Sequence, residues 1–362
     1  AMARDGGGRD NDANDEGDWY AANECGSGIP ASSSSWHGTH VAGTVAAVTN
    51  NSTGVAGTAF NAKVVPVRVL GKCGGYTSDI ADAIVWASGG TVSGVPANAN
   101  PAEVINMSLG GGGSCSTTYQ NAINGAVGRG TTVVVAAGNS NTNVSSSVPA
   151  NCANVIAVAA TTSTGARASF SNYGAGIDIS APGQAILSTL NSGTTVPASA
   201  SYASYNGTSM AAPHVAGVVA LMQAVAPSPL SPAQVETIIK NTARALPGAC
   251  SGGCGAGIVN ADAAVSAALD GGGGTPPPGS GTVLQNNVAV TNLGAASGTA
   301  LNYTISVPAG VSQLRVAISG GSGDADLYVR SGSAPTDTVY TCRPYLSGNA
   351  ETCTLNNPAA GI

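Results

Sequence analysis

The chain has 362 residues, of which 43% are hydrophobic, enough for a large buried core and for two domains. Charged residues make up only 8% of it, and the formal net charge is -6. An acidic chain lacks the basic stripe that nucleic-acid binding requires, and no apolar run approaches the roughly 18 residues of a membrane-spanning helix. We therefore expect neither a nucleic-acid partner nor a membrane span.

Residues 1–36 are polar and acidic, and regular patterns begin at residue 37. Small residues predict a closely packed helix over 37–48. Further helices are predicted at 77–87, 119–129, 210–225 and 231–242, and apolar strands at 64–70, 103–109, 132–137 and 155–159. Ser78 and Ser231 are the predicted N-caps of their helices. Strands that are apolar on both faces and alternate with helices are typical of a parallel sheet covered on both sides, so we expect an α/β fold.

A stretch rich in glycine and proline at 270–282 predicts a linker. Beyond it, short alternating runs are separated by Gly and Pro, which is typical of an antiparallel β-sandwich. These runs lie at 301–307, 314–318 and 326–330. The predicted organisation is thus an α/β domain at 1–269, the linker at 270–282, and at 283–362 a small β-sandwich whose last strands we expect beyond residue 362.

The chain contains eight cysteines, an even number. None forms a Cys-x-x-Cys pair, and no histidine lies near the closest two to complete a zinc site. Disulfides therefore fit better than a metal site, and they imply an oxidising compartment. We expect a secreted protein, with its signal peptide upstream of Ala1.

Hydrolysis of an amide by serine needs a hydroxyl, a base, a carboxylate that orients the base, and hydrogen-bond donors for the oxyanion. The segment GTSMAAPHVAG at 207–217 places Ser209 at the start of a predicted helix. There, unpaired backbone N–H groups and the helix dipole favour developing negative charge. Gly207 leaves room for a substrate backbone. Taken alone, Ser209 could equally be an ordinary N-cap.

The segment around Ser209, together with HGTHVAG at 37–43, resembles the motifs of the subtilisin-like serine peptidase family. The resemblance covers about residues 20–269 and implies a mostly parallel sheet with helices on both faces, which here would lack its first strand. It also implies that Ser209 is the nucleophile and His37 its general base. We interpret the other two histidines, His40 and His214, as structural, because both lie among Val and Ala in predicted helices.

An α/β-hydrolase esterase is the competing enzyme class. That class requires Gly-x-Ser-x-Gly and a histidine well after the serine. Here Ala211 stands where the last glycine would be, and the only later histidine, His214, follows within the same predicted helix. We therefore set the esterase interpretation aside.

The segment VAAGNS at 135–140 resembles the family's oxyanion segment. Asn139 would donate its side-chain amide beside the backbone N–H of Ser209. Asparagine after a strand and a glycine is usually a turn residue, and only the neighbouring motifs favour the catalytic interpretation.

The resemblance also implies a groove in which a peptide substrate adds as an extra strand. Its walls would be small and apolar, which predicts an apolar or aromatic residue before the cleaved bond. The implied wall residues are Ser108, Leu109, Gly110, Ala136, Ala137 and Gly138. Gly74, Gly75 and Tyr76 would line a more distant pocket, or would form a simple loop.

The chain departs from the family in one respect. The family's catalytic aspartate lies in an Asp-Thr-Gly-like segment before the histidine motif, and residues 1–37 contain none. No predicted strand places the aspartates of the acidic segment, so we assign this role to none of them. We expect the aspartate upstream of residue 1 and the chain itself to be inactive or weakly active. The alternative is a catalytically incompetent, protein-binding module.

The acidic segment offers closely spaced oxygen ligands, of the kind that Ca²⁺ accepts six to eight at a time. The candidate ligands are Asp5, Asp10, Asp12, Asp15 and Asp18. The alternative is a solvated acidic loop. Asn51 lies in a second segment that resembles a calcium loop of the family. We expect structural Ca²⁺ from these residues.

Residues 284–362 resemble the pre-peptidase C-terminal domain found behind secreted peptidases. Together the resemblances imply an endopeptidase that acts on protein or peptide substrates, is made with an upstream propeptide and works as a monomer. Spacing does not decide cysteine pairing. Our hypothesis is two local bridges and two that brace loops around the cleft: Cys250–Cys254, Cys342–Cys353, Cys25–Cys73 and Cys115–Cys152.

Overall fold

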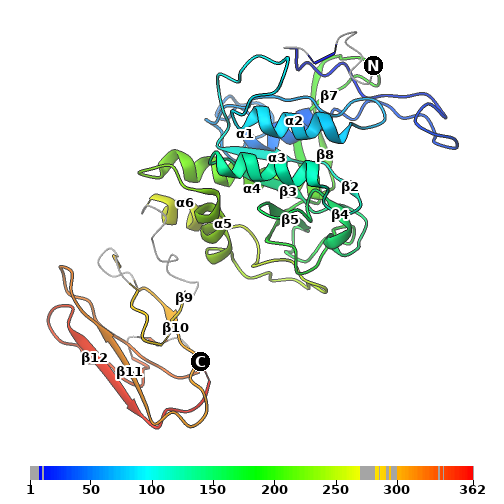
Figure 1. Ribbon diagram of the computed structural model, residues 1–362. Helices are drawn as coiled ribbons and strands as arrows, with labels where there is room; N and C mark the ends of the chain where they lie inside the picture. Colours follow the sequence, from blue (N-terminus) through cyan, green and yellow to red (C-terminus); the bar gives the residue numbers. More distant parts are fainter. Residues whose placement is uncertain are drawn as a thin grey trace. The chain divides into compact units, whose positions relative to one another are not determined.

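The computed structural model divides into two compact units, residues 1–274 and 275–362 (Figure 1). It describes residues 8–9, 12–269, 282–284, 286–290, 293–294, 300–332, 335–336 and 338–361. The division falls inside the predicted linker, most of which lies outside the described residues. The two units are considered separately.

The central sheet of the first unit has four strands in the order β1-β3-β5-β6, and every neighbouring pair is parallel. The strands are β1 (Val104–Met107), β3 (Thr132–Ala136), β5 (Ile156–Thr161) and β6 (Ile179–Pro182). Three of them match predicted strands, and β6 was not predicted. In parallel strands the carboxyl ends meet at one edge of the sheet, and there the candidate site lies.

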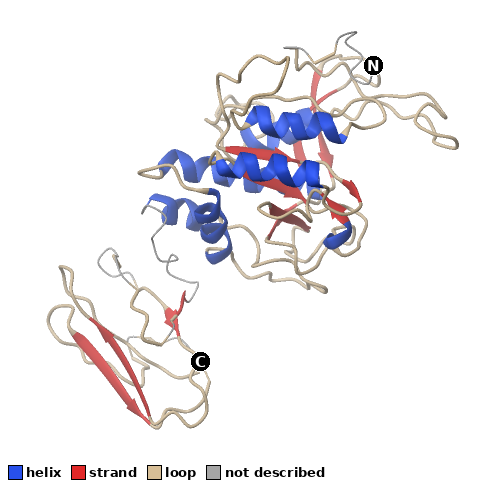
Figure 2. Ribbon diagram, in the orientation of Figure 1, coloured by secondary structure: helices blue, strands red, loops and turns tan. Residues whose placement is uncertain are grey.

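Helices cover both faces of this sheet (Figure 2). They are α1 (His37–Ala46), α2 (Thr77–Ala87), α3 (Thr117–Gly128), α4 (Thr208–Val225), α5 (Pro232–Asn241) and α6 (Ala261–Leu269). Val134 and Val158 pack with α4, α5 and α6, whereas Val133 and Val135 pack with α2 and α3. Successive side chains of a strand point to opposite faces, so burial on both faces explains the continuous apolar runs.

Short elements complete the first unit. An antiparallel pair, β7 (Ile186–Asn191) and β8 (Ala200–Tyr205), packs against α1 through β7. A second antiparallel pair is formed by β2 (Gly111–Gly112) and β4 (Ser147–Val148), and the 3₁₀ helix η1 (Val144–Ser146) directly precedes β4. Among the described helices, α4 alone has the length and composition to cross a membrane. However, 61% of its 18-residue window is buried in the fold, as expected of a core helix.

Two local predictions are wrong. Residues 64–70 pair with no strand in the described part of the chain, and Val64, Val67 and Leu70 are exposed. An apolar run becomes a strand only where a neighbour completes its backbone hydrogen bonds. Helix α2 begins one residue before the predicted cap Ser78, without a side-chain cap. By contrast, Ser231 caps α5 as predicted, in a capping box with Gln234.

The second unit is a small β domain. Its described strands are β9 (Thr282–Val283), β10 (Tyr303–Thr304), β11 (Gln313–Ile318) and β12 (Glu351–Asn356). β11 and β12 pair antiparallel, whereas β9 and β10 pair parallel. The strand predicted at 314–318 is confirmed. Within the described residues, 326–330 form a single isolated bridge, between Val329 and Cys342, in place of the predicted strand. The prediction missed β12.

All four disulfides of the pairing hypothesis are present: Cys25–Cys73, Cys115–Cys152, Cys250–Cys254 and Cys342–Cys353. The first ties the segment before α1 to the loop before α2, and the second ties the start of α3 to the loop before β5. No free cysteine remains in the described part of the chain.

Candidate active site

Three segments that are far apart in sequence meet at the carboxyl edge of the sheet. Ser108 follows β1 directly, and Gly138 follows β3 by two residues. The first turn of α4 is joined to both. The hydroxyl of Ser108 donates to the backbone oxygen of Ser209 at 2.7 Å, and the backbone N–H of Gly138 donates to Oγ1 of Thr208 at 3.0 Å. His37 begins α1, which packs against α4.

The amide of Asn139 is oriented by Thr208. Its Oδ1 accepts a hydrogen bond from the Thr208 backbone N–H at 2.8 Å and another from the Thr208 hydroxyl at 3.0 Å. With Oδ1 engaged, the Nδ2 group faces the space beside Gly207. A side-chain carbon at Gly207 would lie 3.4 Å from Asn139 Nδ2 and 3.5 Å from Ser209 N. Two N–H donors therefore flank one small space, as an oxyanion hole requires.

Replacing Thr208 by valine tests this orientation. The side chain of Thr208 is fully buried, and its hydroxyl serves both Asn139 and the N–H of Gly138. Valine preserves the shape but leaves the Gly138 N–H unpaired and removes one of the two bonds to Asn139 Oδ1, so we expect the free energy of unfolding to fall by about 1–3 kcal/mol. Urea denaturation measures this, and Thr208→Ser, which keeps the hydroxyl, serves as the control. A free energy of unfolding of Thr208→Val equal to that of the unchanged protein would contradict the role of the Thr208 hydroxyl.

Asn172 is a site residue that the sequence analysis missed. It is only 1% exposed, and its Nδ2 donates to the backbone oxygen of Ala137 at 2.9 Å. Its Oδ1 accepts from the N–H groups of Ser140 and Thr142 at 3.0 and 3.1 Å. Asn172 thus holds the loop that carries Asn139. It lies on the separate segment between β5 and β6, and no local motif marks it.

His37 is half-buried at the start of α1. Burial lowers the pKa of its imidazole below the usual value of about 6.5, and nearby His40 lowers this pKa further, whereas Asp18 raises it. The neutral form, which a general base requires, is therefore favoured at neutral pH. The hydroxyl of Ser209 instead donates to the backbone oxygen of Ser108 at 3.4 Å. Both Ser209 and His37 are described, and no hydrogen bond joins them. Such bonds often tighten only when substrate is bound.

The other two histidines occupy interior positions. His40 is fully buried, stacks on Tyr205 with 4.5 Å between ring centroids, and contacts the backbone oxygen of Ala203 through Nε2. His214 contacts the backbone oxygen of Met210 through Nδ1, within α4. Both environments agree with the structural interpretation.

The implied wall of the substrate groove requires one correction. The side chains of Ala136 and Ala137 are 6% and 0% exposed and pack into opposite core layers, because they alternate at the end of β3. They cannot line a pocket, so only the backbone of this segment and Gly138 are available. Leu109 is half-buried and Gly110 is exposed. The more distant candidates Gly74, Gly75 and Tyr76 lie beside the disulfide-bonded Cys73, before α2.

The described acidic residues are engaged by protein groups. Asp12 and Asp15 accept backbone N–H groups through Oδ1, Asp15 also pairs with Arg68, and both carboxylate oxygens of Asp18 bind Ser35. Within the described residues, no three His, Cys, Asp or Glu side chains gather around a metal position. Asp5 and Asp10 lie outside the described residues. Calcium in the acidic segment therefore stays a prediction without support from these contacts.

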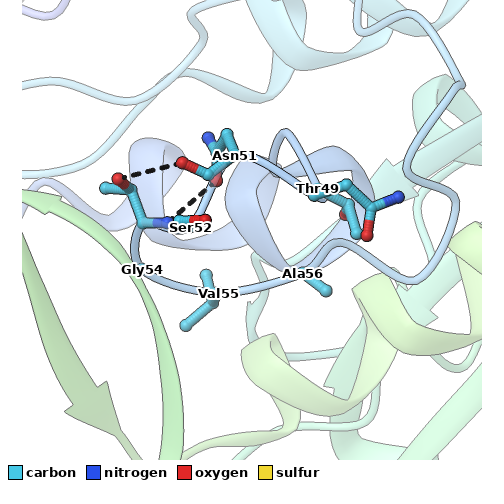
Figure 3. A pocket seen from close by; sticks show the side chains of 8 residues that line it. Thr49, Asn51, Ser52, Gly54, Val55 and Ala56 are labelled. Carbon is cyan, nitrogen blue, oxygen red and sulfur yellow. Dashed lines mark hydrogen bonds between the residues drawn. The ribbon is translucent and has the colours of Figure 1, made fainter.

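The second calcium candidate, Asn51, belongs to a loop that borders a cavity of about 290 Å³ (Figure 3). Its Oδ1 accepts the backbone N–H of Thr53 at 3.1 Å, so the side chain closes a turn. The cavity is lined by residues 49–56, beyond the end of α1, whereas His37 begins that helix. A ten-residue helix is about 15 Å long, so this cavity is separate from the candidate active site.

The parallel sheet with helices on both faces, His37 at the start of α1 and Ser209 in the first turn of α4 together define the subtilase class. The family model described as the subtilase family matches residues 5–257, and the chain belongs to this family. A model described as the bacterial pre-peptidase C-terminal domain matches residues 299–362. The resemblance seen in the sequence motifs is confirmed.

Two of the curated relatives are extracellular proteases by name. The chain is 80% identical over 357 residues to an extracellular protease of Xanthomonas campestris, covering 99% of this chain and 61% of the relative. It is 52% identical to an extracellular basic protease of Dichelobacter nodosus, covering 74% of this chain and 45% of the relative. The chain thus spans about half to three fifths of the length of these relatives.

A solved structure of proteases from Pseudoalteromonas arctica is also similar. Its TM-score is 0.72 at 61% sequence identity, and the match covers 74% of this chain and 80% of that chain. This similarity confirms the predicted subtilisin-like fold of the first unit.

Proposed function

We propose that this chain carries the nucleophile, base and oxyanion hole of a secreted serine endopeptidase. The observation that carries the proposal is the pair of donors, Asn139 Nδ2 and Ser209 N, on either side of the space beside Gly207. A nucleophile whose own backbone N–H forms half of an oxyanion hole is suited to attack on a carbonyl.

The reaction follows from these positions. Ser209 Oγ attacks the carbonyl carbon of the peptide bond while His37 takes its proton, and the oxyanion is held by Asn139 and the Ser209 N–H. His37 then passes the proton to the leaving amine, which yields the acyl-enzyme. Water then attacks the acyl carbon while His37 takes its proton. His37 returns that proton to Ser209 Oγ as the carboxylic acid product is released. The desolvated imidazole of His37 suits the base role, because its pKa is lowered by burial.

Substrates would be proteins or peptides that add as a strand beside Ser108, Leu109 and Gly110. Small apolar surroundings favour an apolar or aromatic residue before the cleaved bond. Four disulfides and the extracellular relatives support secretion. We further propose synthesis with a propeptide, action as a monomer, and weak turnover by residues 1–362 alone, because these residues contain no Asp-Thr-Gly segment.

Labelling with a fluorophosphonate, read by peptide mass spectrometry, tests the proposal. It is applied to this chain and to a version extended upstream of residue 1, here called the extended protein. We expect label on Ser209 in the extended protein and little in the shorter one. In the 362-residue chain, the His37 ring should titrate below its usual value of about 6.5, because burial lowers its pKa.

Ser209→Ala in the extended protein is the control and should abolish the label. Absence of label on both lengths, with both folded, would reject the enzyme and favour a protein-binding module.

A further inference from the structure

The segment before α1 is anchored by the carboxylate of Asp18. The two oxygens of Asp18 accept hydrogen bonds from the backbone N–H and the hydroxyl of Ser35, each at 2.6 Å. Ser35 lies two residues before His37, and its Oγ accepts the His37 backbone N–H at 3.4 Å. Asp18 itself is half-buried. A continuous set of hydrogen bonds therefore runs from Asp18 through Ser35 to the backbone of His37.

The position of Asp18 is defined by the backbone around it. Tyr20 and Ser32 exchange hydrogen bonds of 3.1 and 3.0 Å between their backbones, closing the intervening loop. Cys25, inside that loop, is bonded to Cys73 near the start of α2. The chain that follows Asp18 is thus tied down at two points, and Asp18 meets Ser35 as a positioned group.

Two further side-chain hydrogen bonds join Ser35 and Trp36 to the β7–β8 pair. The hydroxyl of Tyr205, at the end of β8, donates to the backbone oxygen of Ser35 at 2.7 Å. The indole N–H of Trp36 donates to the backbone oxygen of Gly193, between β7 and β8, at 2.6 Å. Trp36 is 2% exposed and has a φ of 49°, in the left-handed region.

A bulky residue in the left-handed region costs on the order of 1–3 kcal/mol and persists only where the surroundings determine it. No side chain caps the start of α1. The direction in which the helix presents its first residue, His37, is therefore set by the contacts of Ser35 and Trp36. Asp18 supplies two of these contacts and the only charge among them.

The charges around His37 act in opposite directions. Burial and His40 lower the His37 pKa, and Asp18 raises it. Tyr205, which stacks on His40, has a pKa raised by burial and by Asp18, so it stays neutral and donates to Ser35. The Asp18 carboxylate, bound to Ser35 two residues before His37, thus favours the positive form that the His37 ring takes when it accepts the proton of the nucleophile.

We propose that Asp18 is a positioning residue for His37, holding the start of α1 through Ser35 and favouring the imidazolium that forms during acylation. The inference rests on the proposed function in assigning His37 as the base. Asp18 acts through its hydrogen bonds to Ser35 and through its charge.

The test compares Asp18→Asn and Ser35→Ala with the unchanged protein. Asp18→Asn removes the charge, whereas Ser35→Ala removes the two hydrogen bonds of the Ser35 hydroxyl, to Asp18 and from the His37 N–H, but keeps the charge. The first readout is an NMR titration of the His37 ring in the 362-residue chain, which has three histidines and is assigned with His37→Gln. We expect His37 to titrate at lower pH in Asp18→Asn, and near its original pH in Ser35→Ala.

The second readout is the rate of fluorophosphonate labelling of Ser209 in the extended protein, at the plateau of its pH profile. Misplacing a catalytic group by about 1 Å costs up to about 10²-fold. We expect both variants to label more slowly within that range, with Asp18→Asn the slower. Asp82→Asn, which removes an exposed carboxylate on α2, is the matched control and should change neither readout.

An unchanged His37 titration and an unchanged labelling rate in folded Asp18→Asn would overturn the inference. Unchanged His40 and His214 resonances show that a variant is folded. The two hypotheses fail separately: if Ser209 of the unchanged extended protein never labels, the proposed function fails, while the titration still decides whether Asp18 acts on His37.

Discussion

Replacing His37 by alanine is expected to lower turnover by about 10⁶-fold in the extended protein. This magnitude is taken from subtilisin, a member of the same family, in which loss of the histidine alone costs about as much as loss of the whole triad. The physical reason is that a serine hydroxyl is a weak nucleophile until a base takes its proton. The neutral imidazole favoured by burial of His37 provides that base.

The measurement is hydrolysis of a chromogenic peptide ester or amide under conditions that saturate the wild-type enzyme. His37→Gln is measured as a second variant, because its amide keeps a polar side chain at this half-buried position. Circular dichroism confirms that both variants are folded. Turnover within tenfold of the wild type in either variant would exclude His37 as the base.

Replacing Asn139 by alanine is expected to lower kcat by about 10²–10³-fold with little change in KM. The Nδ2 donor lies where the oxyanion develops, so its loss acts on the transition state more than on bound substrate. Alanine also removes the acceptor for Thr208, and the two bonds at 2.8 and 3.0 Å are lost with it. We therefore expect a modest accompanying loss of stability, of about 1 kcal/mol.

Ser140→Ala is the matched control for this prediction, because Ser140 is an exposed neighbour whose backbone N–H alone is bound, to Asn172. Its kcat and KM should be close to those of the wild type. A fall in kcat of less than tenfold for Asn139→Ala would mean that its amide does not stabilise the oxyanion. A rise in KM alone would assign Asn139 to substrate binding.

Much of the first unit could be predicted from local patterns. The strand at 132–137 and the helix at 231–242 were located within one or two residues, because apolar periodicity and an N-cap with proline are local signals. The run at 64–70 has the same apolar pattern as a buried strand but stands alone. Whether such a run becomes a strand depends on a partner elsewhere in the chain, which a local pattern does not contain.

The candidate site divides in the same way. Ser209, His37 and Asn139 each lie in a contiguous motif, so the sequence alone predicts these residues and their order along the chain. The groups that hold them come from distant segments without a motif. Asn172 holds the loop of Asn139, and Asp18, assigned at first to calcium, holds Ser35 instead.

The sequence by itself determined the family, the order of the catalytic segments and the oxidising compartment, because short motifs and cysteine counts do not depend on folding. Only the tertiary structure decided which side chains position the chemistry. Tyr205 and Ser35, 170 residues apart, share a hydrogen bond of 2.7 Å, and Thr208 meets Asn139 across 69 residues. The Thr208–Asn139 pair forms at the edge where the parallel strands end, whereas the Tyr205–Ser35 pair forms where β8 meets the segment before α1. No local spacing encodes either pair.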